Sequence, residues 1–229
     1  MRVRFSLLAL GFAALAPALA PTPALAGGRG GAAHKLAVAH LGAGAKDVTV
    51  LASADAGSSP GSAAIVRVDN GGGAPRCSLL VFEGRSAAPE KVVAAEKLSV
   101  CPAYDKDKQP AALERVPLTE RRGAWRVHLG SKRMDAMAGG VETRQLWALV
   151  ADTGSGMHVV FERTSTSFKG QKDASANSSE VCEAPVLPLG SEPSTLTITC
   201  DTMAMLGAAA KKQRSTFSYS WQGDRFGLE

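Results

Sequence analysis

The chain has 229 residues and a formal net charge of +5 at pH 7, and only 5% of its residues are aromatic. Its length fits one large domain or two small ones. The basic residues form short, scattered pairs with acidic residues between them, whereas a nucleic-acid surface gathers its basic side chains on one face. The sequence therefore predicts no nucleic-acid partner. The sparse aromatic residues are expected to belong to the core rather than to a sugar-binding platform.

Residues 1–26 have the three parts of a secretory signal peptide. Arg2 and Arg4 precede an apolar stretch, and Ala24-Leu25-Ala26 has the small-x-small pattern that signal peptidase cuts. We therefore expect the mature chain to begin at Gly27.

An earlier Ala18-Leu19-Ala20 also fits the cleavage pattern, but it would place Pro21 directly after the cut. The apolar stretch is interrupted by Pro17 and is shorter than the roughly 20 residues of a membrane span. We predict a secreted or periplasmic protein with no membrane span once the signal peptide is removed.

The secreted part contains the same landmarks twice and in the same order, which is typical of an internal duplication. In the first half Ala54-Asp55-Ala56-Gly57-Ser58 precedes Cys77, Cys101 and Trp125. In the second half the corresponding landmarks are Ala151-Asp152-Thr153-Gly154-Ser155, Cys182, Cys200 and Trp221.

Four cysteines in an exported chain indicate two disulfides rather than a metal site, and no C-x-x-C motif is present. Three pairings are open to four cysteines. The duplication favours one disulfide in each copy, which pairs Cys77 with Cys101 and Cys182 with Cys200.

We expect a flexible Gly/Ala-rich leader over 27–44, in which Leu36–Leu41 can dock as an edge strand. The duplication then predicts a first β repeat over 45–130, a linker over 131–142 and a second β repeat over 143–229. Within these repeats, alternating apolar and polar residues between turn residues predict strands. The expected strands are Val48–Ser53, Ala64–Asp69, Ser78–Glu83, Lys97–Cys101, Trp125–Leu129, Leu146–Ala151, Met157–Arg163, Val181–Leu187, Leu196–Cys200, Thr216–Trp221 and Arg225–Leu228.

The fold class is therefore all-β and mainly antiparallel, as two small sandwiches or as one pseudo-symmetric sandwich or barrel. The Ala-rich segments Glu90–Lys97 and Met203–Lys212 are expected to be short helices. The polar segment Pro102–Gly123 is expected to be a long loop.

One motif has catalytic character. Leu149-Val150-Ala151-Asp152-Thr153-Gly154-Ser155 resembles the active-site loop of the aspartic proteases, in which two such loops share one proton between their aspartates. The resemblance implies that Asp152 and Asp55 form the catalytic pair. Asp55 is followed by Ala56 where that family has a Thr or Ser that braces the loop. The alternative is that both aspartates occupy hairpin turns, where Asp and Gly are favoured.

The sequence contains no H-E-x-x-H motif and no cofactor fingerprint, so we expect no metal and no cofactor. We expect a non-catalytic binding or structural module of the envelope or the extracellular space, whose partner is an envelope protein or polymer. The alternative function is that of an aspartic-type peptidase using Asp152 and Asp55.

Overall fold

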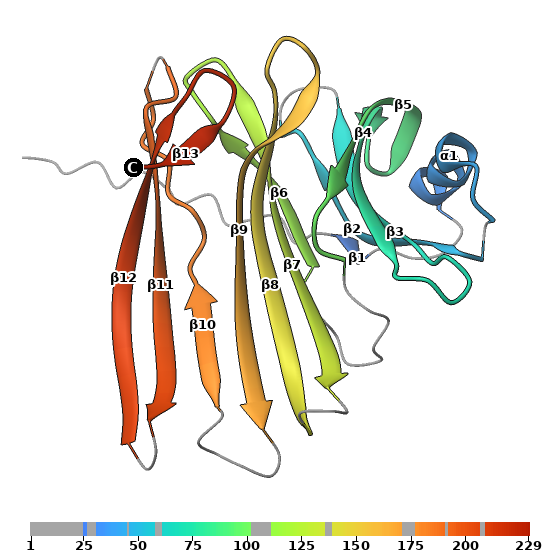
Figure 1. Cartoon of the computed structure of the whole chain (residues 1–229). Helices are drawn as coiled ribbons and strands as arrows, with labels where there is room; N and C mark the ends of the chain where they lie inside the picture. Colours follow the sequence, from blue (N-terminus) through green and yellow to red (C-terminus); the bar gives the residue numbers. More distant parts are fainter. Residues whose placement is uncertain are drawn as a thin grey trace, which may run out of the picture.

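The fold is almost entirely antiparallel β-structure in two sheets (Figure 1), as the sequence predicted, and the described residues also contain one short helix. The computed structural model describes residues 25–26, 31–44, 46–57, 61–101, 111–135, 139–170, 177–190, 192–206 and 209–229. In this described part no helix is long and apolar enough to cross a membrane.

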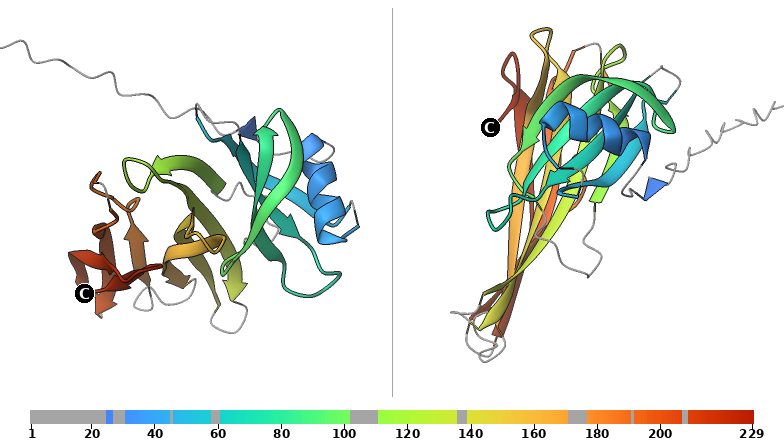
Figure 2. Two further views of the ribbon diagram at one scale, coloured as in Figure 1. Left: turned by 90° about the horizontal axis from the view of Figure 1, so that it is seen from above. Right: turned by 90° about the vertical axis from the view of Figure 1, so that its right-hand side faces the viewer.

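The small sheet has five strands in chain order, and helix α1 (Ala32–Leu41) lies against one of its faces (Figures 1 and 2). The first strand contributes only two residues, which pair with Ala52 and Ser53 at the edge of the sheet. The strands are β1 (Leu25–Ala26), β2 (Val48–Asp55), β3 (Ser62–Val68), β4 (Arg76–Arg85) and β5 (Ala88–Leu98).

The large sheet has eight strands, again in chain order, and several of them extend well beyond the small sheet (Figure 1). Its strands are β6 (Ala111–Pro117), β7 (Gly123–Asp135), β8 (Gly140–Asp152), β9 (Met157–Gly170), β10 (Ser178–Cys182), β11 (Thr195–Leu206), β12 (Ala209–Trp221) and β13 (Phe226–Leu228).

The two sheets pack face to face over the first strands of the large sheet. Trp125, Val127 and Leu129 alternate along β7 and are buried against the small sheet, where Ile65 and Leu79 belong to the same core. The alternation arises because successive side chains of a strand point to opposite faces. Strand β2 contacts β6, and β5 contacts β9, so the small sheet lies over the first half of the large one.

A second core fills the opposite face of the large sheet, which is strongly curved (Figure 2). The ring of Phe161 on β9 meets the ring of Tyr219 on β12 edge to face, with centroids 5.0 Å apart. Two strands lie between β9 and β12 in the sheet order, so this contact requires the sheet to bend round it. The curved face is hereafter called the inner face.

A third core lies under helix α1, and it corrects the prediction of a flexible leader over 27–44. Ala33, Leu36 and Ala37 have the i, i+3, i+4 spacing of one helix face and pack on the small sheet. The helix begins after Gly31 and ends at Gly42, whose φ of 61° is the left-handed conformation that glycine adopts readily. The edge strand expected at Leu36–Leu41 is therefore wrong, and residues 27–30 lie outside the described part.

Both expected helices are strands instead. Glu90–Lys97 lies within β5, whose residues pair with β4 along almost its whole length, and Met203–Lys212 spans the β11–β12 hairpin. The expected strand Lys97–Cys101 overlaps only the end of β5. The expected loop at Pro102–Gly123 contains strand β6; residues 102–110 are outside the described part.

The segment 131–142, expected as a linker, forms part of one long hairpin. Strand β7 continues to Asp135 and β8 begins at Gly140, and these two residues are register partners. The change from one sheet to the other occurs instead between Leu98 and Ala111. The duplication itself stays a prediction.

Candidate functional site

Asp152 organises its own hairpin turn. It is the last residue of β8, and its Oδ1 accepts a hydrogen bond of 2.8 Å from the backbone N–H of Gly154. Gly154 has a φ of 92°, which side-chain-bearing residues adopt rarely. The D-T-G-S sequence is thus used as a turn between β8 and β9.

Asp55 has a similar local role in the other sheet. It ends β2, and its Oδ1 accepts a hydrogen bond of 2.6 Å from the backbone N–H of Ser86 in the β4–β5 turn. No hydrogen bond within the described residues joins the Asp55 and Asp152 carboxylates. Each aspartate is bonded to a backbone donor of its own sheet.

The disulfides have the predicted pairing. Cys77 of β4 bonds Cys101 just after β5, with Cα atoms 5.1 Å apart, and Cys182 of β10 bonds Cys200 of β11, with Cα atoms 4.0 Å apart. Each bridge therefore joins adjacent parts of one sheet.

One cluster has the spacing of a metal site, but its chemistry does not fit a metal. Side-chain atoms of Glu180, Cys182 and Cys200 lie within 4.8 Å of one another. The two sulfur atoms form a disulfide, so neither is a thiolate that could bind a metal ion. The Glu180 carboxylate is also taken up by an ion pair of 2.5 Å with Arg163.

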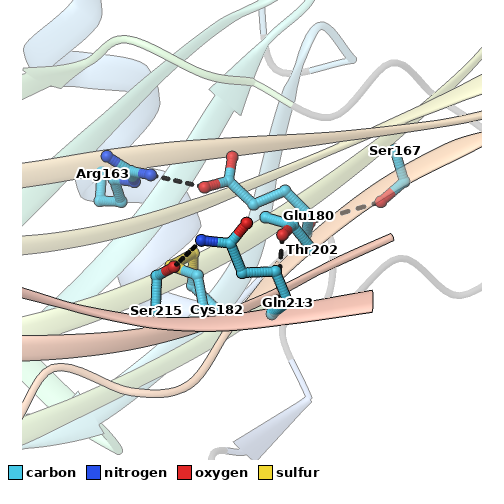
Figure 3. A network of polar contacts seen from close by, with 8 residues as sticks. Arg163, Ser167, Glu180, Cys182, Thr202, Gln213 and Ser215 are labelled. Atoms are coloured by element: carbon cyan, nitrogen blue, oxygen red, sulfur yellow. Dashed lines mark hydrogen bonds and ion pairs between the residues drawn. A yellow bond between two sulfur atoms is a disulfide. The ribbon is translucent and has the colours of Figure 1, made fainter. Parts of the chain in front are cut away.

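Around this cluster, polar side chains form a network on the long strands (Figure 3). The Ser167 hydroxyl donates to the Glu180 carbonyl, and the guanidinium of Arg163 lies over the Phe217 ring at 4.3 Å. Burial lowers the pKa of Arg163, but the hydrogen bond and charge of Glu180, with a smaller contribution from Tyr219, outweigh burial and raise that pKa. The guanidinium is thereby held charged and in place.

The network lies along a seam in the large sheet. Ser178 and Phe168 are the only register partners between β10 and β9 in the described residues. Side chains supply the remaining links, because the Trp147 indole N–H donates to the Cys182 carbonyl at 3.0 Å and Arg126 donates to the Pro185 carbonyl. These contacts therefore link the strands across the seam, which gives them a structural role.

Three buried polar atoms beside this network have no hydrogen-bond partner within the described residues: His128 Nε2, Arg163 Nε and Ser165 Oγ. Burial lowers the pKa of His128, which favours the neutral imidazole. A neutral histidine can act in acid–base catalysis, but solvent does not reach the Nε2 of His128. The described apolar residues of the inner face form a core beside it.

One cavity among the described residues lies in the small sheet, beyond the C-terminal end of α1. Its volume is about 680 Å³, within the roughly 300–1,000 Å³ typical of small-molecule pockets. Residues 41–44 form one wall together with Lys46 and Asp47, and the β3–β4 turn forms another. We call it the α1 pocket, and its lining residues are Leu41, Gly42, Ala43, Gly44, Lys46, Asp47, Val68, Asp69, Asn70, Gly71, Arg76, Ser78 and Lys97.

A second, shallower groove of about 540 Å³ crosses strands β10 to β12. Two of its charged lining residues are already paired with each other, since the Arg214 guanidinium lies 3.3 Å from the Asp201 carboxylate. A further ion pair joins Arg214 to Glu183. The α1 pocket is therefore the stronger candidate for ligand binding.

Sequence reasoning missed the α1 pocket. Its basic residues, Lys46, Arg76 and Lys97, come from a loop and two strands and are far apart in the chain, so no motif unites them. The wall also depends on a close approach, because a Cβ atom at Gly44 would lie 2.6 Å from Asp47 Oδ2. A side chain at Gly44 would displace the Asp47 carboxylate, so the glycine leaves that carboxylate its place on the wall.

Comparison with protein-family models, curated proteins and solved structures found no match for this chain. Function is therefore inferred from the chain's own residues.

Proposed function

We propose that the protein is an exported, non-catalytic binding or structural module whose partner is an envelope protein or polymer. The main support is the position and bonding of the two candidate catalytic aspartates. Asp152 and Asp55 each accept a backbone hydrogen bond within a turn, and they belong to different sheets. An aspartic peptidase needs two carboxylates that share a proton.

Export is supported by the two disulfides, because such bonds persist in oxidising compartments. N-terminal sequencing of exported material tests this part, and we expect it to begin at Gly27. Cleavage there also removes β1 and leaves β2 at the edge of the small sheet. Exported material that still contains Met1 would contradict the proposal.

The absence of catalysis is tested by incubating the mature protein with an unfolded polypeptide at about pH 3 to 6, the range in which paired carboxylates titrate. We expect no cleavage. Cleavage that disappears in both Asp152→Asn and Asp55→Asn would overturn the proposal in favour of the aspartic peptidase. Cleavage that persists in both variants would indicate a contaminating protease.

A further inference from the structure

The floor of the α1 pocket carries polar and basic groups where the sheet face would otherwise be apolar. Arg76, Ser78 and Leu80 occupy every second position of β4, so their side chains share one face. Leu80 is buried under α1, which makes this the helix side of the strand. Lys97 of β5 is the register partner of Ser78 and shares that face. The floor thus changes from the core under α1 to a basic surface beyond it.

The pocket has an excess of positive charge. Its lining includes three basic side chains and two carboxylates, and one of these carboxylates, that of Asp69, is bonded to the buried Arg67 guanidinium. Because Arg67 offsets Asp69, the three basic lining side chains outnumber the remaining carboxylate, that of Asp47. The charged lining residues are Lys46, Asp47, Asp69, Arg76 and Lys97.

The two lysines keep their charge available for a ligand. In the described part of the chain, neither Lys46 nor Lys97 has an acidic side chain within ion-pair distance. By contrast Lys91, on the same strand as Lys97, is paired with Glu83 at 2.7 Å. Arg76 donates a 3.2 Å hydrogen bond to the Asn70 side-chain oxygen, which orients its guanidinium without neutralising it.

We propose that the α1 pocket binds a small anionic ligand, or the anionic end of a polymer, that carries a phosphate or carboxylate group. This inference rests on the proposed function and names the ligand class of the module. Arg76 and Lys97 on the floor and Lys46 on the wall bind the anion by charge-assisted hydrogen bonds. The Ser78 hydroxyl donates a further hydrogen bond.

Asp47 makes the pocket selective. Its carboxylate lies on the wall and would repel a ligand that is anionic on every side. It would accept a hydrogen bond from a hydroxyl group placed beside the anionic group. We therefore expect a hydroxylated anion to bind better than an anion of the same charge with no hydroxyl.

The experiment titrates the mature protein at low ionic strength with inorganic phosphate, glucose 6-phosphate, citrate and tricarballylate, followed by amide NMR shifts and calorimetry. Inorganic phosphate and glucose 6-phosphate test whether the pocket binds a phosphate group, and tricarballylate and citrate test whether it binds carboxylates. In each pair the second compound also carries a sugar or alcohol hydroxyl group. We expect saturable binding of at least one hydroxylated anion, with shifts at Ser78 and Lys97. Binding should weaken as salt screens the charges.

The test variants are Lys97→Gln and Arg76→Gln, and Lys91→Gln is the matched control on the same strand. Each test variant should lose about tenfold in affinity or more, as expected for a charge-assisted hydrogen bond. The control should bind within about twofold of the unmodified protein, since its ammonium lies outside the pocket. Unchanged thermal unfolding of each variant excludes loss of the fold.

The proposal is overturned if none of the four anions binds, or if Lys91→Gln weakens binding as much as Lys97→Gln, because the effect would then be one of net charge. Either result leaves the absence of peptidase activity and the export of the chain untouched. Failure of the ligand class is thus distinguishable from failure of the proposed function.

Discussion

The imidazole of His128 stacks on the indole of Trp147, with ring centroids 4.0 Å apart and 6° between the planes. The two residues are register partners on β7 and β8. Burial lowers the pKa of His128 from its ordinary value of 6.5, because protonation would create a cation that water hydrates poorly at this place.

Stability should therefore fall in mildly acidic solution. In the unfolded chain His128 takes up a proton as the pH falls through about 6.5, whereas in the folded protein it resists protonation until a lower pH. The free energy of unfolding should decrease over that window and then level off below the folded-state pKa. Urea unfolding at a series of pH values measures the decrease.

The matching variant is His128→Gln, which cannot titrate and should show a smaller decrease over the same window. The same change at the exposed His40 is the control for the loss of a histidine as such. An unchanged slope in His128→Gln would contradict this account.

Glu180→Gln should destabilise the protein, because it removes the carboxylate that pairs with the largely buried Arg163 guanidinium. We expect a loss of about 1–3 kcal/mol in the free energy of unfolding. Glu83→Gln removes the partner of the exposed Lys91 and should have no measurable effect. Chemical denaturation of both variants measures the two losses in the free energy of unfolding. Equal losses would show that the ion pair of Glu180 and Arg163 stabilises the protein no more than an exposed ion pair does.

Replacing Cys182 and Cys200 together by alanine should cost roughly 3 kcal/mol of stability on the chain-entropy model. The two positions are 18 residues apart and both are buried, so the bridge closes a short loop within the sheet. The pairing itself is checked by a non-reducing peptide map. A peptide that links Cys77 to Cys182 or Cys200 would show that the pairing is wrong.

Asp152→Asn should change the free energy of unfolding by less than about 0.5 kcal/mol, because the turn is exposed and an Asn side-chain oxygen still accepts the Gly154 N–H. Gly154→Ala should cost about 1 kcal/mol, since its φ of 92° is unfavourable for alanine. Thermal unfolding distinguishes the two. A larger loss from Asp152→Asn than from Gly154→Ala would give the carboxylate a role beyond the turn.

The sequence predicted strands well where apolar residues alternate with polar ones. Trp125, Val127 and Leu129 alternate cleanly with Arg126 and His128, and the structure buries the apolar set between the sheets. The alternation failed to reveal β5, because Ala, Glu and Lys favour helices in isolation. Pairing with β4 decided the conformation of that segment, and tertiary pairing is not encoded in local composition.

Helix α1 and the α1 pocket were out of reach for a related reason. The helix is flanked by glycines and rich in alanine, which in sequence resembles a flexible leader, and only the apolar face of β2 to β4 gives Leu36 and Ala37 something to pack on. Lys46 and Lys97 line the same pocket only because the fold brings a loop and a strand end together. The disulfide pairing could be predicted because the two halves of the sequence have their Asp-x-Gly-Ser motif, their two cysteines and their tryptophan in the same order.

The strictly sequential order of strands in both sheets has a kinetic consequence. Within the described residues every strand pairs only with the strands next to it in chain order, so no pairing among them depends on a distant strand. The entropy of loop closure rises only slowly with loop length, so each pairing costs little chain entropy to begin. The chain should therefore refold faster than all-β proteins of similar size whose sheets are assembled from distant segments. Hairpins can also form one after another during synthesis of the chain.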